Sequence, residues 1–215
     1  MRFRSIFALA ALVFAFAAFA SAQDDYNRAE FFAGYTHNRV DVGLSDEFDD
    51  DDDFDDKLGT HGVNLQVTGN VQRYAGIKFD FAGQTKRESE AFDGGTLDSR
   101  YKLFTFMGGV QFKDNATDGP GVKPFAHILA GGANQSLDFT FTDPDGSDTA
   151  RVSGTDFTMA FGGGLDVKLG KRVDLRVIQL DYNPIFRRTR DNPDFGEIPG
   201  GTQHNFRIGF GIVFH

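Results

Sequence analysis

The sequence predicts an all-β fold: an eight-stranded antiparallel up-and-down transmembrane β-barrel, preceded by a cleavable signal peptide. Residues 205–214 alternate apolar side chains with polar or small ones, which is the period of a strand with one apolar face. Seven earlier segments resemble this one, and the connections between them are alternately long and short, as in outer-membrane barrels. An N-terminal export signal completes the pattern.

The export signal occupies residues 1–22. Arg2 and Arg4 precede an apolar run, and Ala20-Ser21-Ala22 forms a cleavage site. The apolar run is too short for a membrane-spanning helix. We therefore expect one mature domain, residues 23–215, which is the barrel.

Composition excludes several classes of function. The chain has no cysteine, which rules out a disulfide framework, thiolate catalysis and cysteine metal sites. The formal charge is −9, and much of it comes from residues 46–56. There is no basic stripe, so nucleic-acid binding is not expected. No amphipathic helical segments separate the strands, which argues against βαβ units.

The first four strands are expected at residues 28–40, 60–71, 74–83 and 100–112. The second is clear, because Val63, Leu65 and Val67 alternate with polar residues. A long acidic loop is expected at residues 41–59. A polar, glycine-containing loop is expected from the end of the third strand to residue 99.

The last four strands are expected at residues 122–141, 156–168, 173–182 and 205–215. The pattern does not decide which face of the fifth strand is apolar, since Phe125 and Leu129 compete with Ala126 and Ile128. In the seventh strand the alternation slips at Ile178, which predicts a β-bulge. With eight strands, the interior is wide enough only for side chains to fill it.

The mature chain resembles the small OmpA/OmpX-type outer-membrane barrels. The segments that carry the likeness are 69–74, 122–127, 176–182 and 210–214. The resemblance implies an outer-membrane location in a Gram-negative-type bacterium, contact with membrane lipid and lipopolysaccharide, and assembly by the barrel-assembly machinery through the C-terminal strand. It also implies a monomer with loops open to extracellular ligands. One departure is that His215 follows Phe214, where an aromatic residue usually ends the chain.

Charged residues on the polar face of the strands form the first candidate site. Both signs are present in similar number, and we expect them to pair inside the barrel, because unpaired buried charges are costly. Arg176 and Arg207 are expected at the basic centre. This predicted lumen charge cluster is either a structural plug or a gated path for ions or small solutes, and it consists of Lys78, Asp80, Asp166, Lys168, Asp174, Arg176, Asp181 and Arg207.

An acidic run in the first long loop is the second candidate. Carboxylate oxygens suit divalent cations, so the run could bind them, although such runs are usually solvated and repel themselves. The spacing of a formed metal cage is missing, and we predict no defined metal site and no cofactor. The residues concerned are Asp49, Asp50, Asp51, Asp52, Asp53, Asp55 and Asp56.

The sequence gives little support to catalysis. Its histidines show no recognisable pairing with a nucleophile, although His37 and His61 flank the first long loop and could lie close together. The favoured function is a non-enzymatic barrel with a structural interior and mobile loops for surface interactions. A narrow, porin-like channel is the first alternative. A soluble, lipocalin-like ligand-binding barrel is the second, although the many phenylalanines would overfill its interior.

Overall fold

The structure is a computed structural model that describes residues 25–41, 57–144, 146–192 and 196–215. The expected signal peptide lies outside the described residues, as does the acidic run between Asp46 and Asp56. No helix among the described residues is long and apolar enough to span a membrane.

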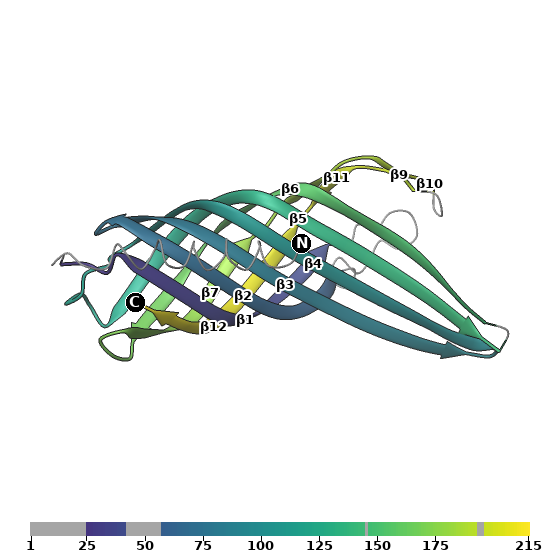
Figure 1. The fold of residues 1–215 in the computed structure, drawn as a ribbon, viewed down its shortest axis with the longest axis horizontal. Coiled ribbons are helices and arrows are strands. Elements are labelled where there is room, and N and C mark those ends of the chain that lie inside the picture. The colour runs from purple at the N-terminus through teal and green to yellow at the C-terminus, as the bar shows by residue number, and fades with distance from the viewer. Residues whose placement is uncertain (1–24, 42–56, 145, 193–195) are drawn as a thin grey trace, which may run out of the picture.

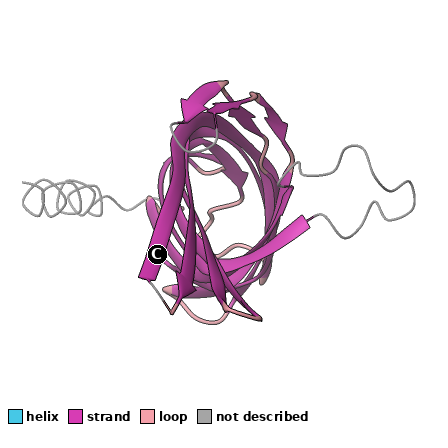
Figure 2. Ribbon diagram, turned by 90° about the vertical axis from the view of Figure 1, so that its right-hand side faces the viewer, coloured by secondary structure: helices cyan, strands magenta, loops and turns pink. Residues whose placement is uncertain are grey.

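Eight strands close into one antiparallel ring, which is seen end-on in Figure 2. Each strand pairs with its neighbours in the chain, and β1 closes the ring by pairing with β12 from Phe31–Phe214 to Val40–Asn205. The predicted eight-stranded barrel is confirmed. The strands are β1 (Ala29–Asp41), β2 (Lys57–Gln72), β3 (Ala75–Phe92), β4 (Gly95–Lys113), β5 (Val122–Asp143), β6 (Gly146–Lys168), β7 (Val173–Tyr182) and β12 (Asn205–Phe214).

Four short strands lie in the connection between β7 and β12. One pair, β8 with β11, joins the end of the barrel wall, because β8 also pairs with β6. The other pair, β9 with β10, forms a separate two-stranded ribbon. Their bounds are β8 (Ile185–Arg187), β9 (Arg190–Asn192), β10 (Gly196–Ile198) and β11 (Gly201–Gln203).

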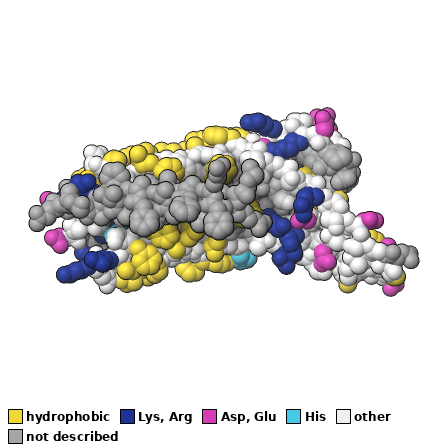
Figure 3. All heavy atoms as spheres, viewed as in Figure 1, with side chains coloured by type: hydrophobic (Ala, Val, Ile, Leu, Met, Phe, Trp, Pro, Cys, Tyr) yellow, Lys and Arg dark blue, Asp and Glu magenta, His cyan; other side chains and the backbone are white. Residues whose placement is uncertain are grey.

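Apolar side chains face outward and polar ones inward, the reverse of a soluble protein. In β12, Phe206, Ile208 and Phe210 are exposed, whereas Asn205 and Arg207 are buried. Together the outward side chains form an apolar band on the barrel wall, part of which is seen on the face drawn in Figure 3. The soluble lipocalin-like alternative is therefore wrong, because most of the phenylalanines lie on the outer surface and do not fill the interior.

Pairing between strands decides two points about side-chain facing: which face of β5 is inside the barrel, and whether β7 contains a bulge. Phe125 and Leu129 of β5 are buried inside the barrel, and Ile128 faces outward. The bulge predicted at Ile178 is confirmed, because Val177 and Ile178 are both exposed while the pairing between β6 and β7 shifts register beside them. The extra residue returns the following side chains of β7 to the interior.

The prediction of a loop between the third strand and residue 99 is wrong. β3 and β4 stay paired until Phe92 meets Gly95, and the turn uses Gly94 with φ of 111°. β5 and β6 likewise stay paired until Asp143 meets Gly146. The four strands therefore continue beyond the barrel as one sheet, at the right of Figure 1. This protruding sheet comprises residues 85–92 of β3, 95–102 of β4, 135–143 of β5 and 146–155 of β6. In β3, polar side chains on both faces of residues 85–90 conceal the extension in the sequence, whereas the expected fifth strand already reaches residue 141.

The opposite end of the barrel carries the β2–β3, β4–β5 and β6–β7 connections. In the β2–β3 turn, Arg73 pairs with Asp114 of the β4–β5 connection, with Nε and Oδ1 at 2.9 Å. The guanidinium of Arg73 lowers the pKa of Asp114 by hydrogen bonding. Short turns at one end and long extensions at the other match the layout of outer-membrane barrels.

Candidate functional site in the barrel interior

The structure brings most of the predicted lumen charge cluster together. Lys168 is the exception: it lies at the end of β6, and its Nζ donates to the carbonyl of Thr117 at 2.8 Å. Lys168 is therefore a rim residue, because the barrel wall ends beside it. The seven members that are buried in the interior are Lys78, Asp80, Asp166, Asp174, Arg176, Asp181 and Arg207.

Arg207 of β12 is held between two carboxylates. Its Nη1 and Nη2 donate to Oδ1 and Oδ2 of Asp80, each at 3.0 Å. Its Nε and Nη2 also donate to Oδ2 of Asp181, at 2.9 and 2.7 Å. The other oxygen of Asp181 lies 2.9 Å from Nε2 of His127, and Nδ1 of that ring lies 3.1 Å from Nζ of Lys78. The guanidinium therefore ties β3, β7 and β12 together across the interior.

Arg176 of β7 forms the second centre. It donates Nε and Nη2 to the two oxygens of Asp166 at 2.7 and 3.1 Å. Its guanidinium carbon lies 4.5 Å from the ring centre of Phe32 and 4.0 Å from that of Phe125. Two aromatic faces and a bidentate carboxylate together compensate much of the cost of burying this cation.

Glycine makes room for the Phe32 ring. Gly34 and Gly211 lie opposite each other on β1 and β12. A Cβ added to Gly34 would meet Phe32 Cζ and the carbonyl oxygen of Phe210 at 2.4 Å. The absence of side chains at Gly34 and Gly211 therefore leaves room for the Phe32 ring against the guanidinium of Arg176.

Two glutamine amides connect the centres. Gln66 donates Nε2 to Asp80 at 2.8 Å, and its Oε1 accepts from Arg176 at 2.7 Å. Gln179 similarly joins Arg176 to Asp181, with Nε2 donating to Oδ2 at 2.7 Å. The buried charges thus belong to one hydrogen-bonded network.

A third group of charges closes the end with short turns. Lys113 lies between Glu30 and Asp166, with its Nζ 2.7 and 2.9 Å from their oxygens. Asp174 is contacted by Lys123 at 3.1 Å and by Nε2 of His215 at 2.9 Å. The last side chain of the chain therefore turns into the barrel, while Phe214 faces outward.

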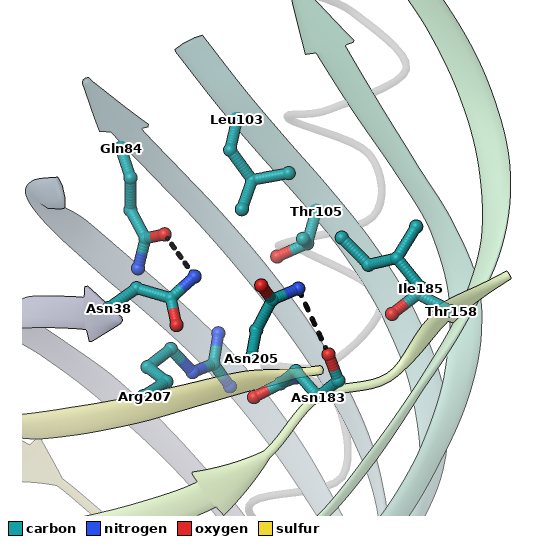
Figure 4. Close-up of a pocket in the computed structure, with 9 residues that line it drawn as sticks. All are labelled: Asn38, Gln84, Leu103, Thr105, Thr158, Asn183, Ile185, Asn205 and Arg207. Carbon is teal, nitrogen blue, oxygen red and sulfur yellow. Dashed lines mark hydrogen bonds between the residues drawn. The ribbon is translucent and has the colours of Figure 1, made fainter. Parts of the chain in front are cut away.

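Neutral side chains fill the opposite end. Nδ2 of Asn38 donates to Gln84 at 3.0 Å, and Nδ2 of Asn205 donates to the carbonyl of Asn183 at 3.1 Å (Figure 4). The void between these residues is about 10 Å³, near the lower limit for a single water. An apolar cluster lies beyond them, formed by Val40, Tyr101, Leu103, Ala133 and Ile185.

Five ionisable residues of the interior network stand outside the predicted lumen charge cluster. Lys113 follows the expected fourth strand and Lys123 lies at the start of the fifth, although each keeps the inward parity of its strand. The pattern does not decide which face of the fifth strand is apolar, and so it does not place His127 in the interior. Glu30 lies near the start of the first strand, and His215 follows the aromatic residue that usually ends such a chain. All five side chains are buried: Glu30, Lys113, Lys123, His127 and His215.

Among the described residues, no group of three or more His, Asp or Glu side chains is arranged to hold a metal ion. His37 and His61 do lie side by side, with their Nδ1 atoms 3.3 Å apart, and Tyr35 contacts His61. No described carboxylate forms an ion pair with either ring. The acidic candidates from Asp49 to Asp56 lie outside the described residues.

Comparison with known proteins agrees with this architecture. Residues 6–214 match a family described as "Outer membrane protein beta-barrel domain". The structure is similar to Ail, the attachment invasion locus protein of Yersinia pestis, solved with the heparin analogue sucrose octasulfate. The two are 19% identical, the TM-score is 0.51, and the match covers 86% of this chain and 97% of Ail. Neisserial surface protein A is 10% identical with a TM-score of 0.53, covering 89% and 99%.

A third structure, the outer membrane protease OmpT of Escherichia coli, is 8% identical with a TM-score of 0.47, covering 91% of this chain and 99% of the protease. A likeness this low carries no argument about activity. A search of curated proteins found no significant match. The family match over nearly the whole chain, together with the outward apolar band, shows that this protein belongs to the outer-membrane β-barrel family and is located in the outer membrane of a Gram-negative-type bacterium.

Proposed function

We propose that the protein is a non-enzymatic outer-membrane barrel with a closed, structural interior and a surface for extracellular interactions. The single observation that carries the proposal is the connected interior network, in which Arg176 and Arg207 are each held by carboxylates on other strands. Interior ion pairs with this many partners hold the strands in register. The void beside them has room for one water at most.

The protruding sheet supports the surface role. β2 pairs with β3 only as far as Thr85, and β8 pairs with β6 from Phe157. Beyond those residues no described strand pairs with either edge of the sheet. Unpaired edges present backbone donors and acceptors in a row, which is the geometry that binds an extended peptide. We expect this sheet to take the place of the mobile loops predicted between these strands.

We also propose the partners that the family implies, which are the barrel-assembly machinery, membrane lipid and lipopolysaccharide. The outward apolar stripe of β12 ends at Phe214, and His215 points inward. The barrel-assembly machinery would therefore still meet a terminal aromatic side chain on the outer face. Lipid and lipopolysaccharide would cover the apolar band, and the closed ring needs no second copy to complete it, which is consistent with a monomer.

The channel alternative has one observation in its favour. Ion pairs and hydrogen bonds link charged and polar side chains from Lys123 at one end of the interior to Arg207. Exchange of ion-pair partners could open a path along them. Conductance of the refolded mature chain in a planar bilayer separates the two functions, after heat-modifiable gel migration has shown an intact barrel.

We expect a folded barrel that carries no discrete current. Arg207→Ala and Arg176→Ala should remain without reproducible channels, as should the matched control Arg188→Ala, whose side chain is exposed. Discrete channels whose conductance changes in the two interior variants, and not in the control, would overturn the structural interior and establish a pore. Hydrolytic activity dependent on His37 or His61 would overturn the non-enzymatic assignment.

A further inference from the structure

Four charged residues stand in one row across the outer face of the protruding sheet. Arg87 of β3 is directly opposite Arg100 of β4, which is opposite Asp138 of β5, which is opposite Arg151 of β6. Residues opposed in this way on antiparallel strands place their side chains on the same face. The four residues are called the arginine row below.

Within the arginine row, only the arginine at the β6 end is neutralised by an ion pair inside the protein. Arg151 donates Nε to Oδ1 of Asp138 at 2.5 Å, and Lys102 reaches the other oxygen at 3.5 Å. No carboxylate of the described residues forms an ion pair with Arg87 or Arg100. Two like charges directly opposite each other destabilise a sheet. An anion placed between them would remove that cost and gain two planar hydrogen-bonding forks.

The row also has the shape of a binding site. A shallow hollow of about 590 Å³ lies over it, lined by the three arginines, by the hydroxyl-bearing Ser89, Ser99, Thr140 and Thr149, and by the acidic Glu88, Asp98 and Asp138. Hydroxyl and guanidinium groups are the usual donors to phosphate oxygens. The arginines and hydroxyl groups therefore supply donors suited to an anionic group, beside three carboxylates that oppose it.

The position of the arginine row relative to the apolar band indicates which molecule supplies the anion. Arg100 and Lys102 share the outward parity of Phe104, whose side chain is 55% exposed in the apolar band. Likewise Arg151 shares the parity of Phe157 in β6. Figure 3 shows Lys and Arg side chains gathered where the apolar band ends, at the base of the protruding end. Because the apolar band matches the hydrocarbon core, head groups of the outer leaflet are expected where the band ends.

We propose that the arginine row binds phosphate groups of lipopolysaccharide in the outer leaflet. The proposal specifies where the lipopolysaccharide contact of the proposed function is made, and it does not depend on whether the interior is closed. Arg87 and Arg100 hold the phosphate between them, while Arg151 and Lys102 hold Asp138 away from it. Lipid bound here would anchor the base of the protruding sheet at the membrane surface.

The test uses the full mature chain refolded in detergent micelles, with binding of diphosphoryl lipid A followed by native mass spectrometry. The variant is Arg87→Gln with Arg100→Gln. Its matched control is Lys171→Gln with Arg172→Gln, which removes the same charge from the exposed turn at the opposite end of the barrel. Heat-modifiable migration confirms that every variant is folded. We expect the affinity of the Arg87/Arg100 variant to fall by at least about ten-fold, and that of the control to stay within about two-fold.

Further binding measurements test whether the anion is the phosphate of a lipid or a soluble anion. Dephosphorylated lipid A should bind wild type no better than it binds the variant. Sucrose octasulfate and inorganic phosphate, as soluble anions, should bind more weakly than lipid A. Replacing both arginines by lysine, which keeps the charge but loses the planar fork, should restore only part of the affinity.

Unchanged lipid A binding in the Arg87/Arg100 variant would overturn the proposal. Equal or tighter binding of the soluble polyanion would also overturn it, and would indicate a free anionic glycan as the ligand. A current in planar bilayers would overturn the closed interior, but it would not change the outcome of the lipid A binding test. Failure of the closed interior and failure of the lipopolysaccharide site can therefore be told apart.

Discussion

Arg207 and Asp80 are 127 residues apart in the chain, yet they meet through two parallel hydrogen bonds of 3.0 Å inside the barrel. Both side chains are almost completely buried, at 4% and 0% exposure. The pair links β12 to β3 across the interior, since neither strand is the other's neighbour in the ring. It can form only when the ring has closed, and it therefore reports on closure.

Removal of Arg207 should destabilise the barrel strongly. Arg207→Ala leaves Asp80 and Asp181 buried with fewer partners, and breaking a buried pair in this way typically costs about 3–5 kcal/mol. Urea unfolding in detergent micelles, followed by circular dichroism, measures the loss. The control Arg73→Ala removes the exposed pair with Asp114 and should cost less than about 1 kcal/mol. Equal effects of the two changes would contradict the role of the interior pair.

Adding side-chain volume at Gly34 should oppose ring closure. A Cβ there would meet Phe32 and the backbone of β12 at 2.4 Å, and Gly34→Val adds two methyl groups beyond it. Overpacking of this kind costs about 1–3 kcal/mol or more. The heat-modifiable band on gels should weaken. Gly121→Val is the control, because nothing lies within 4 Å of an added Cβ there. A band as strong for Gly34→Val as for the control would show that β1 and β12 can separate freely.

The outward apolar band should tolerate no charge at its centre. Phe210 of β12 is 53% exposed in the described chain, and we expect lipid to cover it. Phe210→Arg should cost about 2–4 kcal/mol in a bilayer, the range for an arginine on the lipid face at the midplane. Phe141 of the protruding sheet is also exposed, but beyond the band, so Phe141→Arg should have a much smaller effect. Folding yield into liposomes of defined thickness measures the difference.

The Asp138 carboxyl offers a pH test of the protruding sheet. The hydrogen bond from Arg151 lowers the pKa of Asp138 below its ordinary value. A lowered folded-state pKa means that the stabilising contribution is present above the unfolded pKa of about 3.9 and is lost as pH falls through the folded value. Arg151→Gln should raise the pKa of Asp138, as followed by carboxyl NMR in bicelles. An unmoved titration would show that the pair does not persist in solution.

The sequence by itself determined the barrel architecture. A period of two is a local property of a strand: residues 206, 208, 210 and 214 face one side whatever the strand pairs with, and lipid requires that side to be apolar. The same local logic placed Arg176 and Arg207 in the interior and predicted the bulge at Ile178. Seven of the eight predicted lumen charges could be found in this way.

Only the tertiary structure decided where strands end and which charges meet. Residues 84–90 carry polar side chains on both faces, so their pairing depends on a neighbouring strand and leaves no periodic signal. Lys168 kept the inward parity but lies where the wall stops. Partners such as Arg207 and Asp80 are chosen by the tilt and register of the closed ring, and a period of two contains no information about that geometry.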